Sequence, residues 1–425
     1  MDIIVENIRG FSGRRRIPIR PISVLTGENS TGKTSFLAMV SSLFDSEGYP
    51  SSPNFNKEPY RLGGYDTIAT YKGGRYGRAD YFSLGYQSRE DDISVESKYV
   101  KGEGKISLKN IVVKTENKIL SVDMAEEEEG KVIVRIKSEG RSFEEVVEME
   151  EGIVGKGMAG QEIFFALSLA SSDELKEVIG GDEGVEELFR ITNYIVPGES
   201  VSLAPIRTKP KRTYGQVVDK YDPSGKHIPS TLSKIFRNKD RSEERKRVFD
   251  SIRRFGKMSG LFEDVRIKKL GDKLTDPFQL QVKGEGRWAN IVDVGYGVSQ
   301  VLPVIAQSTM TSDEAALLLQ QPEVHLHPRA QAALGSFFAE IMSNSNQYLA
   351  VETHSDYILD RIRREINEGT ISSSDVVVLF FEKDGVESRV HPLKLDSKGN
   401  VLDPPDSYRS FFLEEEVNML KKGVS

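Results

Sequence analysis

The chain has 425 residues, 38% of them apolar, which is enough to bury the core of one large domain with insertions or of two domains. It contains no cysteine, which excludes disulfides and thiolate metal sites and fits a reducing compartment. The first residues have no charged-then-apolar leader, and no run reaches the roughly 18 apolar residues of a membrane helix. We therefore expect a cytoplasmic protein without a membrane partner.

Residues 1–40 have the pattern of a strand, a turn, a second strand, a phosphate-binding loop and a helix. Gly27, Gly32, Lys33 and Thr34 match G-x-x-x-x-G-K-[ST] between an apolar strand and a helix, which is the context the motif requires. In such a loop, backbone N–H groups surround a phosphate, Lys33 reaches the β- and γ-phosphates, and the Thr34 hydroxyl ligates Mg²⁺. We therefore predict ATP and Mg²⁺ as cofactors. The predicted nucleotide contacts of this loop are Asn29, Ser30, Thr31, Gly32, Lys33, Thr34 and Ser35.

Asn29 narrows the class of nucleotide-binding protein. The form G-x-N-x-x-G-K-[ST] resembles the loops of the ATP-binding-cassette (ABC) superfamily, which includes the chromosome-maintenance (SMC), recombination-repair (RecF-like) and overcoming-lysogenization-defect (OLD) ATPases. No N-K-x-D motif, which reads the guanine base in GTPases, follows the loop. The resemblance implies an α/β P-loop NTPase of the ABC/SMC-like type.

Short alternating segments such as "ISVESKYV" and "KVIVRIKS" between about 60 and 150 predict an antiparallel β lobe. The acidic run at 126–129 is expected to be a solvated turn within it, and residues 160–195 have helical spacing. We predict three parts: an N-terminal ATPase lobe (1–150), a helical and basic insertion (151–275), and a C-terminal ATPase lobe (276–425).

Charge is unevenly distributed along the chain. The net charge is −7, yet residues 205–257 contain 16 Lys and Arg against 6 Asp and Glu; this segment carries +10 and the remainder −17. Cations interleaved with aromatic residues suit a nucleic-acid backbone more than base reading. A solvated surface that balances the chain's own acidic regions, or a docking surface for an acidic effector, remains the alternative. The candidate nucleic-acid contacts are Arg207, Lys209, Lys211 and Arg212.

From 278 onward, apolar strands alternate with helical patterns and predict a mostly parallel sheet covered on both faces. Three segments follow one another here: "DVGYGVSQVLPVI", then "ALLLQQPEVHLHPRAQ", then "AVETHSD". Their order and spacing are similar to those of the signature loop, the Walker B strand and the switch histidine of cassette ATPases. This resemblance implies that Gly297, Ser299 and Gln300 contact the γ-phosphate of a partner subunit, so that two ATP molecules lie between two copies. It also assigns His354 as the switch histidine. A Ser-capped helix without a ligand is the alternative for the signature segment.

The Walker B segment differs from the usual pattern of two acids. Gln320 and Gln321 end the strand, and the nearest carboxylate is Glu323. An amide cannot act as a general base, but it can accept a hydrogen bond from a Mg²⁺-bound water or position a nucleophile. We predict slow hydrolysis, with Gln320 beside Thr34 at the metal and Gln321, Glu323 and His354 as the catalytic set.

The histidines permit one other chemistry. His325 and His327, followed after one strand by His354 and Asp356, could assemble a metal site of the phosphoesterase type. We favour the interpretation without a metal site, because "PEVHLHP" lies where the superfamily places a dimer-contact loop.

As a whole, the chain resembles the OLD-like, RecF/SMC-like AAA ATPases of bacterial anti-phage systems, which are typically paired with a separate nuclease or effector. The resemblance implies an ATP-dependent homodimer or higher oligomer that senses or clamps nucleic acid, such as DNA, and controls that effector. A host DNA-repair ATPase is the second interpretation. A transporter nucleotide-binding subunit is the third, disfavoured because nothing resembles the surface that docks membrane helices. The product of the neighbouring gene, nuclease or repair factor, would best separate the first two.

Overall fold

The computed structural model describes residues 1–74, 77–88, 92–124, 131–138, 141–148, 196–215, 220–273 and 276–408. The acidic run at 126–129 and the helical pattern at 160–195 lie outside these residues. Within them, no helix is both long and apolar enough to cross a membrane.

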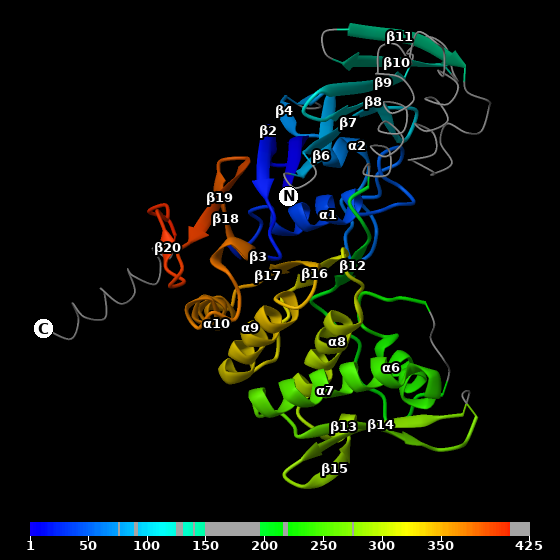
Figure 1. Ribbon diagram of the computed structural model, residues 1–425, viewed down its shortest axis with the longest axis vertical. Coiled ribbons are helices and arrows are strands. Elements are labelled where there is room, and N and C mark those ends of the chain that lie inside the picture. Colours follow the sequence, from blue (N-terminus) through cyan, green and yellow to red (C-terminus); the bar gives the residue numbers. More distant parts are fainter. Residues whose placement is uncertain are drawn as a thin grey trace, which may run out of the picture.

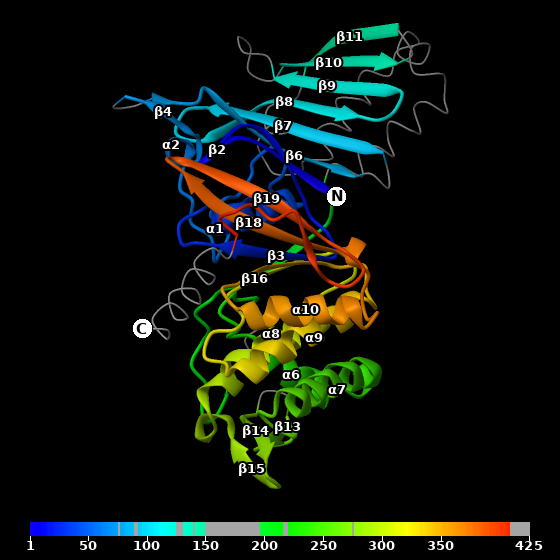
Figure 2. The same ribbon diagram turned by 90° about the vertical axis from the view of Figure 1, so that its left-hand side faces the viewer.

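Two large sheets and a group of helices lie in successive layers along the molecule (Figures 1 and 2). The first sheet is antiparallel and has eight strands, in the order β11 (Arg141–Glu148), β10 (Lys131–Ser138), β9 (Lys118–Met124), β8 (Ile106–Lys114), β7 (Ile93–Lys101), β6 (Tyr81–Ser88), β1 (Asp2–Ile8) and β2 (Phe11–Pro18). The second has seven, in the order β12 (Ser200–Leu203), β16 (Ala316–Gln320), β17 (Tyr348–Glu352), β3 (Ile22–Gly27), β18 (Val376–Asp384), β19 (Glu387–Leu395) and β20 (Val401–Leu402).

Two smaller sheets and the helices complete the described chain. The smaller sheets are β13 (Asp264–Lys269), β14 (Phe278–Gly284) and β15 (Arg287–Asn290), and the pair β4 (Tyr71–Gly73) and β5 (Gly77–Arg78). The helices are α1 (Lys33–Leu43), α2 (Tyr65–Ile68), α6 (Ile228–Arg237), α7 (Ser242–Ser259), α8 (Tyr296–Met310), α9 (Pro328–Met342) and α10 (Asp356–Asn367). Three short 3-10 helices span Lys239–Arg241, Ile291–Asp293 and Ser373–Asp375.

The central strands β16, β17 and β3 of the seven-stranded sheet are buried on both faces, as their continuous apolar sequences predict. Leu318 of β16 faces α1 and the eight-stranded sheet, whereas Leu317 and Leu319 face the helices on the other side. Figure 2 shows α8, α9 and α10 beneath this sheet, with α6, α7 and the three-stranded sheet beyond them. The strands β12, β16, β17, β3 and β18 are mutually parallel. The predicted parallel, covered sheet is therefore present.

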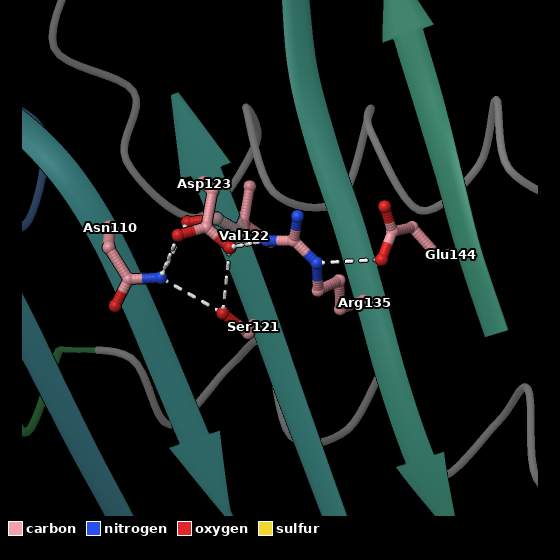
Figure 3. Close-up of polar contacts among 6 residues, drawn as sticks. All are labelled: Asn110, Ser121, Val122, Asp123, Arg135 and Glu144. Carbon is pink, nitrogen blue, oxygen red and sulfur yellow. Dashed lines mark hydrogen bonds and ion pairs between the residues drawn. The ribbon is translucent and has the colours of Figure 1, made fainter. Parts of the chain in front are cut away.

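The predicted antiparallel β lobe is also present, since β6 to β11 pair only antiparallel. One face of this sheet is apolar and packs on α1 at β6, and the other face carries polar side chains. On that polar face Arg135 donates to Asp123 and Glu144, and Asn110 donates to Asp123 and Ser121 (Figure 3). These contacts link four adjacent strands, β8 to β11, which form the outer part of the sheet.

The sheets do not follow the predicted division of the chain. β12 lies within the expected insertion (151–275), yet it pairs in parallel with β16 as an edge of the central sheet. β1 and β2 belong to the eight-stranded sheet, and β14, which the sequence pattern grouped with the parallel strands, belongs to the small three-stranded sheet. Strand patterns predict that a segment is extended but not which sheet it joins, because the pairing partner is distant in sequence.

Candidate nucleotide-binding site

The loop between β3 and α1 is wound tightly around the start of the helix. Gly27, Ser30 and Gly32 have φ angles of 128°, 62° and 107°. A Cβ atom at Gly27 would lie 2.0 Å from the carbonyl oxygen of Phe381 in β18, so a larger residue does not fit there. α1 has neither a side-chain cap nor an acidic residue in its first turn. Its first N–H groups and the positive end of its dipole are therefore available to an anion.

Lys33 is held at the centre of this loop by the loop's own carbonyl groups. Its side chain is 3% exposed, and Nζ donates hydrogen bonds to the carbonyl oxygens of Gly27 at 2.8 Å and Glu28 at 2.6 Å. Burial lowers the pKa of Lys33, while the negative charges of Glu352 and Glu28 act in the opposite direction. The ammonium group thus has a fixed position in the loop that the motif assigns to phosphate binding.

The other predicted loop residues differ in their exposure. Thr31 Oγ1 donates to the Glu28 carbonyl at 2.8 Å and closes the turn, and Ser35 Oγ accepts a hydrogen bond from Arg9 at 3.3 Å. Arg9 lies in the turn between β1 and β2, so the eight-stranded sheet also contacts the phosphate loop. The exposed members of the predicted set are Asn29, Ser30 and Thr34.

The Thr34 hydroxyl, predicted to ligate Mg²⁺, contacts a carboxylate that the sequence interpretation did not select. Its Oγ1 lies 3.1 Å and 2.9 Å from the two carboxylate oxygens of Glu352, the last residue of β17. Gln320, the other predicted metal residue, is 6% exposed and contacts the same carboxylate with Nε2, at 3.5 Å. The acidic residue of "AVETHSD" was the available signal, because it ends a strand beside the P-loop strand.

The three predicted catalytic residues do lie together around the turn after β16. Gln321 has a φ of 43°, and its backbone N–H donates to the Glu352 carbonyl at 2.7 Å. Glu323 is 9% exposed, and its Oε1 accepts a hydrogen bond of 2.9 Å from the backbone N–H of His354. The imidazole of His354 is exposed. The Walker B turn and the turn after β17 are therefore joined by two hydrogen bonds.

Arg207, predicted as a nucleic-acid contact, is instead buried beneath this turn. It is 3% exposed, and its Nη2 donates to the carbonyl oxygens of Gln320 at 3.4 Å and Gln321 at 3.2 Å. Burial lowers the pKa of Arg207 to about 10, and the charge of Glu323 partly opposes this. Nε and Nη1 of Arg207, like Oε2 of Glu323, have no hydrogen-bond partner among the described residues. The surface assignment of Arg207 was wrong because it follows β12, which the sequence did not place in the central sheet.

The predicted signature residues lie inside a helix rather than ahead of it. α8 begins at Tyr296, so Gly297, Ser299 and Gln300 fall in its first turns. Ser299 is 6% exposed, and its hydroxyl donates to the Tyr296 carbonyl at 2.7 Å. The exposed groups here are the ring of Tyr296 and the imidazole of His325, which meet edge to face at 4.9 Å. The phosphate contact proposed for Ser299 therefore requires its hydroxyl to leave an intrahelical hydrogen bond.

The alternative metal site is not assembled in the described part of the chain. There, no group of three or more His, Cys, Asp or Glu side chains is placed to hold a metal ion. His327 instead caps α9, with its Nδ1 accepting a hydrogen bond from the backbone N–H of Arg329 at 3.3 Å.

Three of the four predicted nucleic-acid residues are exposed, and two of these, Lys209 and Lys211, form no ion pair within the described residues. Lys209 and Lys211 line a cavity of about 260 Å³ beside the first turns of α8, together with Lys226 and Ser299. Arg212 is exposed but forms a paired contact with Asp293, at 2.5 Å and 2.9 Å, which reduces its net charge at the surface. Among the described residues, no carboxylate forms an ion pair with Lys209 or Lys211.

Comparison with known proteins supports the nucleotide-binding assignment. Residues 168–360 match the model of the family described as "AAA domain, putative AbiEii toxin, Type IV TA system". The match includes α8, the Walker B strand β16 and His354. This segment is similar to an AAA-type P-loop ATPase domain, and the phosphate loop at 27–34 lies outside the matched residues. The more specific OLD-like and anti-phage assignments stay predictions, and no curated protein matches the chain.

Three solved structures of SMC head domains match the chain over most of its length, at low identity. The head bound to the C-terminal winged-helix domain of ScpA is 12% identical, with a TM-score of 0.44, and the match covers 93% of this chain and 98% of that one. The head domain from Thermotoga maritima is 10% identical, with a TM-score of 0.39 and coverage of 93% and 98%. The head with an extended coiled coil from Pyrococcus furiosus, bound to the C-terminal domain of ScpA, is 11% identical, with a TM-score of 0.40 and coverage of 100% and 99%. The predicted α/β P-loop NTPase fold is confirmed by the family match and by the parallel central sheet with helices on both faces, not by these three structures.

Proposed function

We propose that the protein binds ATP with Mg²⁺ and hydrolyses it slowly. The observation that supports this best is the contact between the phosphate loop and the ends of the neighbouring strands, where Thr34, Glu352 and Gln320 meet. Their hydroxyl, carboxylate and amide groups all contain the oxygen atoms that Mg²⁺ prefers. When bound, Mg²⁺ neutralises charge on the β- and γ-phosphates.

Binding and hydrolysis depend on different residues of this site. Lys33 and the start of α1 bind and orient the phosphates, since they supply the cation and the free N–H groups. Glu323 is the nearest carboxylate of the Walker B turn, and the N–H of His354 fixes one of its oxygens while the other has no partner among the described residues. We assign Glu323 as the group that accepts a proton from the attacking water.

Titration with a fluorescent ATP analogue and a steady-state phosphate-release assay test both assignments. Lys33→Ala should abolish nucleotide binding, whereas Glu323→Gln should retain binding and lower hydrolysis. Wild-type turnover is expected at or below ~10 s⁻¹, the median for enzymes, because amides stand where acids are usual. Hydrolysis at the wild-type rate by Glu323→Gln would show that another group is the base.

We propose that ATP promotes self-association of two copies through the surface at the start of α8. The exposed Tyr296 and His325, packed edge to face beside the signature residues, support this choice. Sedimentation velocity with and without ATP and Mg²⁺ tests it, with Tyr296→Arg as the interface variant. Ser299 is unsuitable for this test because it is buried and an arginine there would disturb the helix. An oligomer whose sedimentation coefficient changes neither with ATP nor in Tyr296→Arg would exclude this arrangement.

The ligand regulated by this cycle is proposed to be nucleic acid, contacted electrostatically by Lys209 and Lys211. Their exposure and lack of carboxylate partners among the described residues support an external anion. We further propose that the protein controls a separate nuclease or effector in anti-phage defence, which the toxin named in the family description supports. A phage-plating assay in cells that carry the protein and its neighbouring gene product tests this role. Equal protection by wild type and Lys33→Ala would argue against it.

A further inference from the structure

The Walker B strand ends without a negative charge at the position nearest the phosphate loop. β16 ends at Gln320, and a neutral amide is a weaker ligand for Mg²⁺ than a carboxylate. Gln320 lies directly opposite Glu352 in the parallel pairing of β16 with β17. Glu352 in turn lies opposite Leu25 of β3, the strand that leads into the phosphate loop. A carboxylate is therefore present one strand closer to the loop than the Walker B strand.

The carboxylate of Glu352 is held toward the loop. Both of its oxygens lie within 3.1 Å of Thr34 Oγ1, and the side chain of Gln320 contacts Oε2. The backbone is fixed on both sides, because the Glu352 carbonyl accepts a hydrogen bond from Gln321 and the next N–H, of Thr353, donates to Leu25 at 3.1 Å. This position is consequently set by the sheet and not by a mobile loop.

The buried carboxylate of Glu352 is attracted by the charge of Lys33 but forms no direct ion pair with it. Glu352 is 7% exposed, and it forms no ion pair within the described residues. Its contacts are a hydroxyl and an amide, both neutral, while the Lys33 ammonium donates its hydrogen bonds to carbonyl groups instead. A buried carboxylate is costly unless a charge compensates it. A divalent cation beside Thr34 is the compensation that this arrangement suits.

We propose that Glu352 takes the place of the missing Walker B acid and, with Thr34, holds the Mg²⁺ of bound ATP, directly or through a metal-bound water. Gln320 donates its amide N–H to Glu352 and acts as a positioning residue. This assignment rests on the proposed binding of ATP. It differs from the sequence prediction, in which Gln320 itself met the metal.

Binding of Mn²⁺, measured by electron paramagnetic resonance in place of Mg²⁺, tests the assignment without reference to hydrolysis. The protein is first saturated with a non-hydrolysable ATP analogue, and free Mn²⁺ is then followed during titration. Glu352→Gln keeps the shape of the side chain and removes its charge, and we expect Mn²⁺ affinity to fall at least ~10-fold. Affinity for the analogue in excess EDTA should be unchanged or higher, because a negative charge near the phosphates is lost.

A matched control and a rescue variant separate a metal ligand from a structural residue. Asp45→Asn removes a carboxylate of similar burial that lies beyond the C-terminal end of α1 and pairs with Lys57, and it should leave Mn²⁺ affinity within about twofold of wild type. Gln320→Glu combined with Glu352→Gln should restore most of the lost affinity, because the two side chains are neighbours across the strand pair. Thermal unfolding of each variant without nucleotide identifies any that fails to fold, and for such a variant the rescue pair alone decides.

The outcomes distinguish this assignment from the proposed function. Tight Mn²⁺ binding by folded Glu352→Gln, or no rescue by Gln320→Glu, overturns the assignment of Glu352 while ATP binding stands. A wild-type protein that binds no analogue, either with a divalent cation or in EDTA, overturns the proposed ATP binding, and the assignment with it.

Discussion

Replacing Arg207 by methionine should change stability little and activity greatly. Arg207 is a buried cation whose Nη2 donates two long hydrogen bonds to the turn after β16, while Nε and Nη1 have no partner among the described residues. Methionine fills a comparable volume with flexible apolar atoms. The substitution therefore removes the charge and these hydrogen bonds but keeps most of the packing.

The expected change in the free energy of unfolding follows from these contacts. Burial lowers the pKa of Arg207 to about 10. Because this pKa lies well below that of a free arginine, burying the cation costs about 3 kcal/mol, after the attraction to Glu323 is included. Two hydrogen bonds to neutral carbonyls contribute about 1 kcal/mol each. The free energy of unfolding of Arg207→Met should thus lie within about 1 kcal/mol of the wild-type value. Breaking a well-paired buried ion pair, by contrast, costs about 3–5 kcal/mol.

Urea unfolding of the nucleotide-free protein, followed by circular dichroism, measures the stability, and phosphate release measures the activity. We expect ATP turnover to fall at least ~10-fold, because Arg207 supports the Gln320 and Gln321 carbonyls and faces Glu323. Arg207→Lys is the matched control, since it keeps a charge but loses the planar donor group. A loss of 3 kcal/mol or more in Arg207→Met would refute the view that this arginine is poorly compensated. Unchanged turnover would refute its link to the Walker B turn.

Three further outcomes are expected. Gly27→Ala should abolish nucleotide binding, measured with a fluorescent ATP analogue, because its Cβ would lie 2.0 Å from a backbone oxygen of β18; normal binding would mean that the loop is not held there. Acidification should destabilise the wild type more than His227→Gln, because burial lowers the pKa of His227. The stabilisation that the neutral imidazole contributes is complete above the ordinary pKa of ~6.5 and is lost as pH falls below it. Parallel thermal-melting profiles of the two proteins from pH 8 to 5 would contradict this. Lys209→Gln with Lys211→Gln should reduce the log–log salt slope of duplex DNA binding by about 1.8 in a filter-binding titration, with ATP binding unchanged; no DNA binding by the wild type at low salt would leave an acidic protein as the partner.

The phosphate loop could be predicted from the sequence because its chemistry is local. The motif occupies only eight residues, from Gly27 to Thr34. Two of its positions are glycines, Gly27 and Gly32, and both have the positive φ angles that glycine adopts most easily. The antiparallel lobe was similarly predictable, since β6 to β11 pair in the order in which they follow one another in the sequence. These features depend on short-range patterns that a single sequence displays.

Glu352 and Arg207 could not be assigned in the same way. Thr34 and Glu352 are 318 residues apart, and their contact exists only because β17 inserts between β16 and β3. Arg207 belongs to a segment whose composition indicates a charged surface, but β12 brings its start under the Walker B turn. Strand order within a parallel sheet is set by long-range crossovers, which local patterns do not encode.

The position of α1 between the two large sheets restricts how the nucleotide site can move. Ten of the eleven residues of α1 are buried, and only Thr34 at its start is exposed. The helix contributes to the core under the eight-stranded sheet and also packs on β16 and β3. A helix enclosed in this way cannot shift by itself without opening voids on both sides. Its amide hydrogens should consequently be among the slowest in the protein to exchange with deuterated solvent, and any displacement of α1 requires the side chains packed on it from both sheets to rearrange as well.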